Sequence, residues 1–311
     1  MHRIRDWLSA SGLPSSDGAP LPTSKKRFPD GAQYRVEIPS VEGPEVLAAV
    51  LAEADHRGVC VHRVSQGSGG MLLTDTELAS MVELAADRSI EVSLFARPLA
   101  GWSNSAAALA PGAGALAAQA RGTEQLVQCL ADIHRSTDAG VRSVLVTDIG
   151  VLCSASKLRV DGYLPEDLQF KISVQMGLAN GAAIRIVEYL GASTYNVPTD
   201  LTLEQLASIR AAVDIPLDVY IEAPDDLGGF VRHFEIGEIV RVASPVYVKF
   251  GLRNAPNIYP SGTHLTPVAI ALARERVRRA QIGLDLLARY YPEAAMSKLP
   301  ARGLAVPKRP R

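Results

Sequence analysis

The stretches PLDVYIEA (216–223) and PVYVKFGLR (245–253) decide the fold prediction, because both have the pattern of short strands with polar residues at every second position. Asp218 and Glu222 alternate with apolar residues in the first stretch, and Lys249 does so in the second. Successive side chains of a strand point to opposite faces, so these charged groups share one face. In a chain that alternates strands with helices both sheet faces are covered, and an unpaired buried charge is costly. The pattern therefore predicts an enzyme site inside a strand–helix protein.

Outward from these stretches, the chain alternates strand and helix along its length. The predicted strands are residues 34–39, 59–66, 90–98, 142–148, 170–176, 193–200, 217–223 and 245–253. Two of the helices between them begin with capping-box patterns, one at Thr74 and one at Thr202. Eight strand–helix pairs in about 260 residues predict an α/β fold with a single (β/α)8 TIM-type barrel. A doubly wound sheet is the alternative, and it is disfavoured because no GxGxxG follows the first strand.

The composition along the chain predicts three segments. Residues 1–33 are expected to form a flexible leader, residues 34–295 the barrel, and residues 296–311 a basic tail. An Ala/Gly/Pro-rich segment, 99–121, follows the third strand. A loop this long suits either a lid over a site or a surface loop.

Overall composition narrows the class of protein and its partners. The 311 residues are 47% hydrophobic and 21% charged, which is typical of a folded globular chain. The formal net charge of −1 gives no electrostatic basis for binding nucleic acid or an anionic membrane. No apolar run reaches the length of about 18 residues that a membrane span needs. We expect a cytoplasmic protein whose partner is a small-molecule or peptide-like substrate, with homo-oligomerisation left open.

Because side chains alternate between the two faces of a strand, the predicted strands place many polar side chains inside the barrel, where branched aliphatic residues usually pack. Lys249 is the first catalytic candidate, because burial beside Arg253 would lower its pKa and suit it as a base or imine-forming nucleophile. Glu222 is expected on the neighbouring strand, about 5 Å away, as the proton partner of Lys249. Asp218 and Lys171 complete the catalytic candidates. A buried lattice of ion pairs is the structural alternative for this set.

Substrate-binding candidates lie at the strand ends and in the loops that follow. Arg97 and Arg253 suit bidentate capture of a carboxylate or phosphate. The remaining candidates are Glu37, His62, Arg63, Gln175, Asn196 and His264. The glycine-rich turns GSGG (67–70) and DLGG (226–229) would let backbone N–H groups approach an anion, although turns need glycine anyway.

A metal site has a weaker basis in the sequence. Glu37, His62, Asp148 and Glu222 form an alternative set of hard ligands for a divalent metal. No HExxH or HxH signature accompanies them, and the three cysteines are widely spaced without a CxxC pair. No GxSxG motif supports serine-hydrolase chemistry. We expect no required cofactor, with a divalent metal as the alternative.

Several motifs of the chain resemble those of one known family. The motifs HRVSQGSG (62–69), LGASTYNVPTDLTLEQLASIR (190–210), PLDVYIEAPDDLGGFVR (216–232) and VYVKFGLRNAP (246–256) are similar to the peptidase U32 family, and in particular to its short, barrel-only bacterial members. The resemblance implies a TIM-type barrel and a peptidase or collagenase-like hydrolase. Family members are also linked to hydroxylation of RNA or cofactors with an iron–sulfur cluster, but this chain lacks the grouped cysteines that would hold one.

Three functions follow from these patterns. The first is a hydrolase for a peptide-like or other amide substrate, as the resemblance implies. The second is a lyase, aldolase or isomerase that uses Lys249 and Glu222 on a carboxylate- or phosphate-bearing metabolite. The third is a non-catalytic ligand-binding barrel, which a mouth filled with aliphatic side chains would favour.

Overall fold

A closed barrel of parallel strands forms the centre of the protein. The computed structural model describes residues 1–13, 15–16, 18–97 and 119–309, so the predicted loop at 99–121 lies outside the described residues except for its last three. Within those ranges eight strands follow one another around the barrel: β1 (Tyr34–Pro39), β2 (Arg63–Ser65), β3 (Glu91–Phe95), β4 (Ser143–Val146), β5 (Gln169–Ile172), β6 (Thr194–Asn196), β7 (Leu217–Glu222) and β8 (Val246–Phe250). β8 pairs in parallel with β1 and closes the ring. The predicted (β/α)8 barrel is confirmed.

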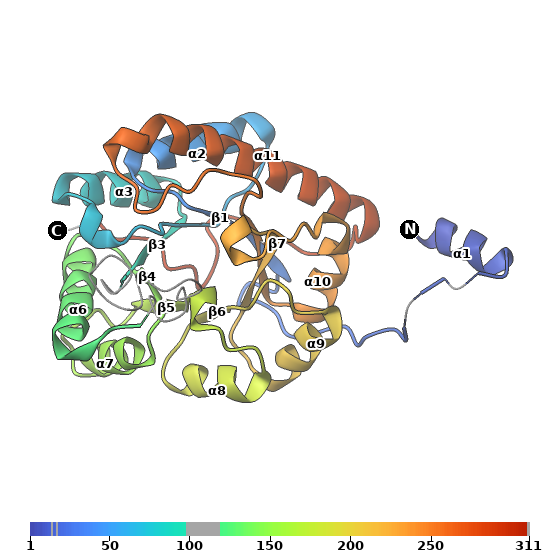
Figure 1. Cartoon of the computed structure of the whole chain (residues 1–311), viewed down its shortest axis with the longest axis horizontal. Helices are drawn as coiled ribbons and strands as arrows, with labels where there is room; N and C mark the ends of the chain where they lie inside the picture. The colour runs from blue at the N-terminus through green and yellow to red at the C-terminus, as the bar shows by residue number, and fades with distance from the viewer. Residues whose placement is uncertain (14, 17, 98–118, 310–311) are drawn as a thin grey trace.

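Helices surround the barrel on its outside, as Figure 1 shows. They are α2 (Pro44–Arg57), α3 (Asp75–Asp87), α6 (Gly122–Asp138), α7 (Ile149–Val160), α8 (Gly181–Tyr189), α9 (Leu203–Ala212), α10 (Ile236–Ala243) and α11 (Thr266–Tyr290). Both predicted capping boxes form, at the start of α3 with Thr74 and at the start of α9 with Thr202. In the described part of the chain, no helix combines the length and apolar character needed to cross a membrane.

The apolar core lies between the strands and the surrounding helices rather than inside the barrel. Val36 and Ile38 of β1, and Val219 of β7, point outward and are fully or almost fully buried under the helices. The alternate residues of the same strands point inward, and they are mostly polar or charged. This division leaves the barrel interior available for a polar site.

Both ends of the chain reach the barrel. Helix α1 (His2–Ala10) stands away from it in Figure 1, but residues 24–33 run along its surface, where Lys26 donates to the carbonyl of Val213 at 2.6 Å. Near the other end, Arg35 of β1 donates to the Ser297 hydroxyl at 2.9 Å and to the Arg302 carbonyl at 2.7 Å. The segment after α11 therefore packs against the N-terminal end of the barrel, opposite the strand ends where barrel enzymes bind substrates.

Candidate active site

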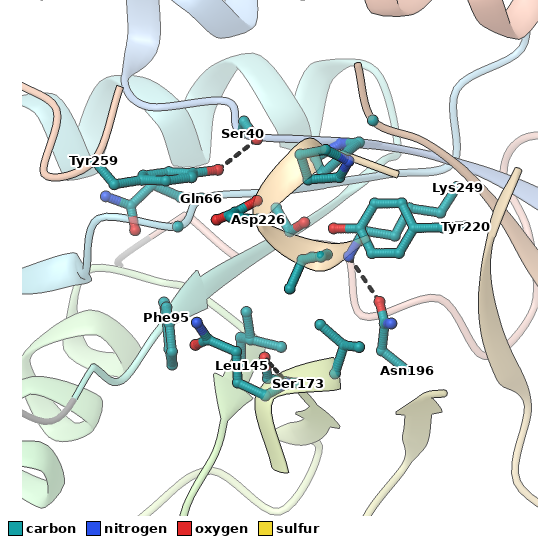
Figure 2. A pocket seen from close by; sticks show the side chains of 18 of the residues that line it. Ser40, Gln66, Phe95, Leu145, Ser173, Asn196, Tyr220, Asp226, Lys249 and Tyr259 are labelled. Carbon is teal, nitrogen blue, oxygen red and sulfur yellow. Dashed lines mark hydrogen bonds between the residues drawn. The ribbon is translucent and has the colours of Figure 1, made fainter. Parts of the chain in front are cut away.

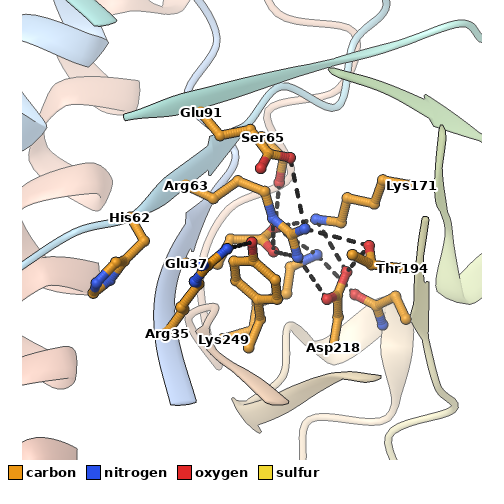
Figure 3. Close-up of polar contacts among 12 residues, drawn as sticks. Arg35, Glu37, His62, Arg63, Ser65, Glu91, Lys171, Thr194, Asp218 and Lys249 are labelled. Carbon is orange, nitrogen blue, oxygen red and sulfur yellow. Dashed lines mark hydrogen bonds and ion pairs between the residues drawn. The ribbon is translucent and has the colours of Figure 1, made fainter. Parts of the chain in front are cut away.

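A buried network of charges fills the middle of the barrel, and the Glu37 carboxylate lies at its centre (Figure 3). One carboxylate oxygen accepts hydrogen bonds from Nε and Nη2 of Arg63, at 2.8 and 2.5 Å. The other accepts from the Ser65 hydroxyl at 2.7 Å and from Lys171, and lies 3.2 Å from Nζ of Lys249. Glu37 is thus shared by three basic side chains from three different strands.

Two further carboxylates complete this network. Asp218 lies 2.6 Å from Arg63 and 3.7 Å from Lys171, and Glu91 lies 3.7 Å from Arg63. The network, called the Glu37 cluster below, consists of Glu37, Arg63, Glu91, Lys171, Asp218 and Lys249. Three basic and three acidic side chains face each other, which offsets the large cost of removing charges from water.

The two lysines of the Glu37 cluster respond to it in opposite directions. Burial and the charge of Arg63 lower the pKa of Lys171 to about 7, although Glu37 acts against this shift. Burial would also lower the pKa of Lys249, but Glu37, Tyr220 and Asp218 outweigh it and raise that pKa above its usual value. The expectation that Lys249 has a lowered pKa is therefore wrong. Arg253, expected beside Lys249, is exposed, and its guanidinium pairs with Asp225, 3.7 Å away.

A cavity of about 250 Å3 opens above the Glu37 cluster, at the C-terminal ends of the strands (Figure 2). Lys249, Asn196 and Tyr220 form the part of its wall that borders the cluster. Lys249 donates to Oδ1 of Asn196 at 2.9 Å, and its ammonium lies 4.5 Å from the centre of the Tyr220 ring. Burial raises the pKa of the Tyr220 hydroxyl, which therefore stays protonated and able to donate.

The loop after β7 brings a carboxylate to the same cavity. Asp226 lies in the short η4 turn (Asp225–Leu227), and Figure 2 shows its side chain beside that of Tyr220. Desolvation against the cavity wall and the charge of Asp225 raise the pKa of Asp226, although Arg97 acts against this shift. A carboxylate with a raised pKa is a suitable group for proton transfer near neutral pH.

The loop between β8 and α11 covers another side of the cavity with Tyr259. The Tyr259 hydroxyl donates to the Ser40 hydroxyl at 2.5 Å. Its ring lies so close to Gly67 that a Cβ on this residue would come within 2.6 Å of the ring, so glycine is required there. The N–H groups of Gly67 and Ser68 donate to the Glu42 carboxylate at 2.8 and 3.0 Å. The GSGG turn therefore binds a carboxylate of the chain itself.

The sequence-predicted residues fall into three places. Lys249, Asn196, Gln175 and Arg97 line the cavity. Glu37, Arg63, Lys171 and Asp218 belong to the Glu37 cluster. Glu222, His62, Arg253 and His264 are not among the described residues that line the cavity. Arg253 and His264 are exposed, His264 in the η6 turn (Thr263–Leu265) before α11.

Glu222 is not beside Lys249, where the alternation of side chains along the strand predicted it. The pairing of β7 with β8 is irregular between Tyr220 and Glu222, so Tyr220 lies opposite Lys249 but Glu222 lies opposite Phe250. An extra residue in a strand shifts the following side chains to the other face. The Glu222 carboxylate consequently accepts from the N–H of Arg253 at 3.0 Å and from Arg279 of α11 at 3.4 Å.

His62 also points out of the barrel, away from the Glu37 cluster (Figure 3). Its Nδ1 accepts a hydrogen bond from the N–H of Val36 at 3.1 Å, so the ring proton is on Nε2, which donates to the Ser297 carbonyl at 2.9 Å. Burial lowers the pKa of His62 to about 4. Its neighbour Arg63 points into the barrel instead and pairs with Glu37. His62 packs under the segment that follows α11, through its hydrogen bond to Ser297.

The alternative metal ligands do not come together. Glu37 is in the Glu37 cluster, His62 and Glu222 point outward, and Asp148 accepts from the N–H of Val151 at 2.9 Å as the cap of α7. Across the ranges that the structure describes, no group of three His, Cys, Asp or Glu side chains is arranged as a metal site requires.

Asp226 and Arg276 are the charged residues of the cavity that sequence reasoning missed. Asp226 was considered only as part of the glycine-rich turn DLGG, and its position after β7 was the available signal. Arg276 lies on α11, on the buried helix face with Ala273, Val277 and Ala280. An arginine on the apolar face of an amphipathic helix was a second available signal.

A comparison with protein families gives one match. The peptidase U32 family model matches residues 115–223, about a third of the chain, from before α6 to the end of β7. This match supports a U32-family assignment. The matched segment includes two motifs on which the resemblance was based, 190–210 in full and 216–232 in part. No curated protein is detectably similar to the sequence.

Solved structures of similar arrangement include several barrel proteins. The U32 peptidase Mk0906 is 16% identical over 66% of this chain and 73% of its own, with a TM-score of 0.37. A truncated 3-deoxy-D-arabino-heptulosonate 7-phosphate synthase from Thermotoga maritima is 13% identical over 86% of this chain and 91% of its own, with a TM-score of 0.45. A ribulose-1,5-bisphosphate carboxylase/oxygenase from Pyrococcus horikoshii OT3 is 10% identical over 88% and 67%, with a TM-score of 0.47.

The lowered pKa of His62 predicts how the stability of the protein depends on pH. The unfolded state takes up a proton near pH 6.5, whereas the folded state resists protonation until about pH 4. The contribution of His62 to the free energy of unfolding is therefore fully present above pH 6.5. It is lost between pH 6.5 and pH 4, and the loss amounts to up to about 3 kcal/mol. Urea unfolding should show that the free energy of unfolding falls less between pH 7 and pH 4.5 in His62→Gln than in the wild type. The control variant His134→Gln changes an exposed histidine and should lose as much stability as the wild type. If His62→Gln also loses as much as the wild type, His62 is not the source of this pH dependence.

Proposed function

We propose that the protein is an enzyme that transfers protons and stabilises negative charge on a carbonyl oxygen of a small anionic or peptide-like substrate in the cavity. The observation that carries this proposal is a lysine with a raised pKa in the cavity wall, Lys249, backed by the Glu37 carboxylate. A charged group fixed where negative charge develops is usually the largest single contribution to catalysis.

Lys249 acts in this proposal as an ammonium ion and not as a nucleophile. A protonated amine has no lone pair, so it cannot attack a carbonyl to form an imine. Its charge can instead attract a carbonyl oxygen, and the neighbouring Tyr220 hydroxyl can donate a hydrogen bond to the same oxygen. Asn196 and Glu37 fix the ammonium in position by hydrogen bonding and ion pairing, so little reorganisation is needed when the substrate reacts.

Asp226 is the proposed acid–base group. In amide hydrolysis it takes a proton from water, the water oxygen attacks the carbonyl carbon, and the carbonyl oxygen becomes an anion beside Lys249. The proton on Asp226 then passes to the leaving amine as the carbon–nitrogen bond breaks and the carbonyl is restored. The peptidase description of the matched family favours this reaction.

A lyase or isomerase reaction would use the same groups differently. Asp226 would take the proton from a carbon next to the carbonyl, and Lys249 would stabilise the resulting enolate. The modest cavity, about 250 Å3, favours this alternative because it suits a small metabolite or one residue of a peptide. A non-catalytic binding barrel is disfavoured, because polar side chains such as Ser40, Gln66 and Ser173 line the mouth together with the apolar ones.

The charge of Lys249 can be tested by substitution. Assays would use a panel of N-acetylated dipeptides and 2-oxo acids, with products identified by mass spectrometry. Lys249→Met should lower kcat by about 10²–10³-fold, because it removes the charge that stabilises the oxyanion. Lys249→Arg should retain more activity than Lys249→Met, since it keeps the charge. Lys298→Met, at an exposed position, is the control. Near-wild-type kcat in folded Lys249→Met would remove Lys249 from the mechanism.

The role of Asp226 predicts a pH dependence of activity. Because Asp226 works as a base in its ionised form and its pKa is raised, kcat/KM should rise with pH through a value above the ordinary carboxyl range. Asp226→Asn should lower kcat by about 10²–10⁴-fold and abolish this acidic limb. Asp200→Asn, which changes an exposed carboxylate after β6, should leave the profile unchanged. An acidic limb that persists in Asp226→Asn would assign the base to another group.

A further inference from the structure

An arginine from the outer helix layer reaches the cavity. Arg276 belongs to α11, yet it lines the cavity together with Tyr259 and Tyr220, and only 5% of its surface is exposed. A guanidinium keeps its charge in proteins, so its position in the cavity wall places a fixed positive charge there.

No carboxylate in the described part of the chain neutralises this charge. Among the described residues, no carboxylate lies within ion-pair distance of Arg276, and its Nε and Nη1 have no hydrogen-bond acceptor. The segment 98–118, outside the described ranges, has no Asp or Glu in its sequence. Arg63 provides the contrast, because this fully buried arginine has Glu37, Asp218 and Glu91 around it.

Glu42 is the carboxylate that most affects Arg276, but it does not neutralise it. Burial lowers the pKa of Arg276, and Tyr259 and Glu42 offset only part of that shift. The Glu42 oxygens are occupied by the N–H groups of Gly67 and Ser68, and burial raises the pKa of Glu42, which weakens it as a countercharge. A buried guanidinium without a counterion is costly, and an anion in the cavity would remove that cost.

We propose that Arg276 is the receptor for a substrate carboxylate, so that the substrate is an acid whose carboxylate lies at Arg276 and whose carbonyl lies at Lys249. This inference rests on the proposed function. Tyr220 belongs to the wall between the two subsites, because its ring lies 4.5 Å from the Lys249 ammonium and it lines the same cavity as Arg276. Arg97 lines the same cavity and adds a second positive charge.

The observations favour a carboxylate over a phosphate. Phosphate sites commonly use a group of free backbone N–H groups beside a glycine-rich turn. In this cavity the N–H groups of Gly67 and Ser68 already bind Glu42. A planar guanidinium matches a carboxylate well. The carboxylate has two sources of the same chemistry, a free small acid such as a 2-oxo acid or the C-terminal residue of a peptide.

Calorimetric titration at low salt can test the receptor role. The probes are pyruvate and N-acetylalanine, each with its neutral amide, pyruvamide and N-acetylalaninamide, and inorganic phosphate. At least one acid should bind the wild type while its amide does not, and Arg276→Met should weaken that binding by about 10–100-fold. Pyruvate binding alone would identify a free small acid, and N-acetylalanine binding alone a peptide terminus. Arg274→Met, an exposed arginine two residues earlier on α11, should bind like the wild type.

Two further measurements keep the inference separate from the proposed function. Without ligand, the melting temperature of Arg276→Met should equal or exceed that of the wild type, because the variant removes an uncompensated buried charge. In the Lys249→Met background the acid should still bind and Arg276→Met should still weaken it, even if Lys249 proves irrelevant to turnover. The carboxylate role would be overturned if the wild type bound neither acid, or if it bound phosphate only. It would also be overturned if Arg276→Met had a lowered melting temperature but bound the acid as tightly as the wild type.

Discussion

The ion pairs of the Glu37 carboxylate are the interaction on which the rest of the site depends. This one carboxylate accepts from Arg63, Ser65 and Lys171 and lies 3.2 Å from the ammonium of Lys249. Burial lowers the pKa of Lys249, and Glu37 is the largest of the interactions that oppose burial and raise that pKa above its usual value. Glu37 therefore converts a buried amine, which would be a nucleophile or base, into a fixed positive charge in the cavity wall.

The Glu37 cluster also explains why two buried lysines of one barrel differ. Lys171 is fully surrounded and has the positive charge of Arg63 nearby, so its pKa falls to about 7. Lys249 lies one layer higher, against Tyr220 and the cavity, where the carboxylates outweigh burial. The deeper lysine belongs to the balanced charges within the barrel, and the upper one lines the cavity, where the proposed function has it meet the substrate.

The sequence was sufficient to predict the barrel and much of its interior. Strict alternation along each strand placed Glu37, Lys171, Asn196 and Lys249 inside, because the period of two holds wherever a strand is regular. It was wrong at Glu222, where the irregular pairing of β7 with β8 turns the side chain toward α11. Such irregularities depend on the packing of neighbouring strands, which a single sequence does not reveal.

Two charged cavity residues that come from outside the predicted strands, Asp226 and Arg276, were beyond this reasoning. Asp226 depends on the path of a loop, and Arg276 depends on how far a helix side chain reaches over the strand ends. Neither distance can be read from strand periodicity, whereas the unusual place of Arg276 on the apolar face of α11 was visible in the sequence. Strand periodicity therefore reached cavity residues on a strand or just beyond its end, such as Asn196 and Gln175, but not those from the η4 turn or from α11.

The measurement that tests the account most directly is an NMR titration of lysine side chains labelled with 13C at Cε. The two buried signals would be assigned with Lys171→Met and Lys249→Met and followed from pH 6 to pH 11. The account predicts that Lys171 titrates near pH 7, that Lys249 stays charged after the exposed lysines have begun to titrate, and that Glu37→Gln lowers the pKa of Lys249. Loss of the Lys249 proton below the ordinary lysine range in the wild type would contradict it.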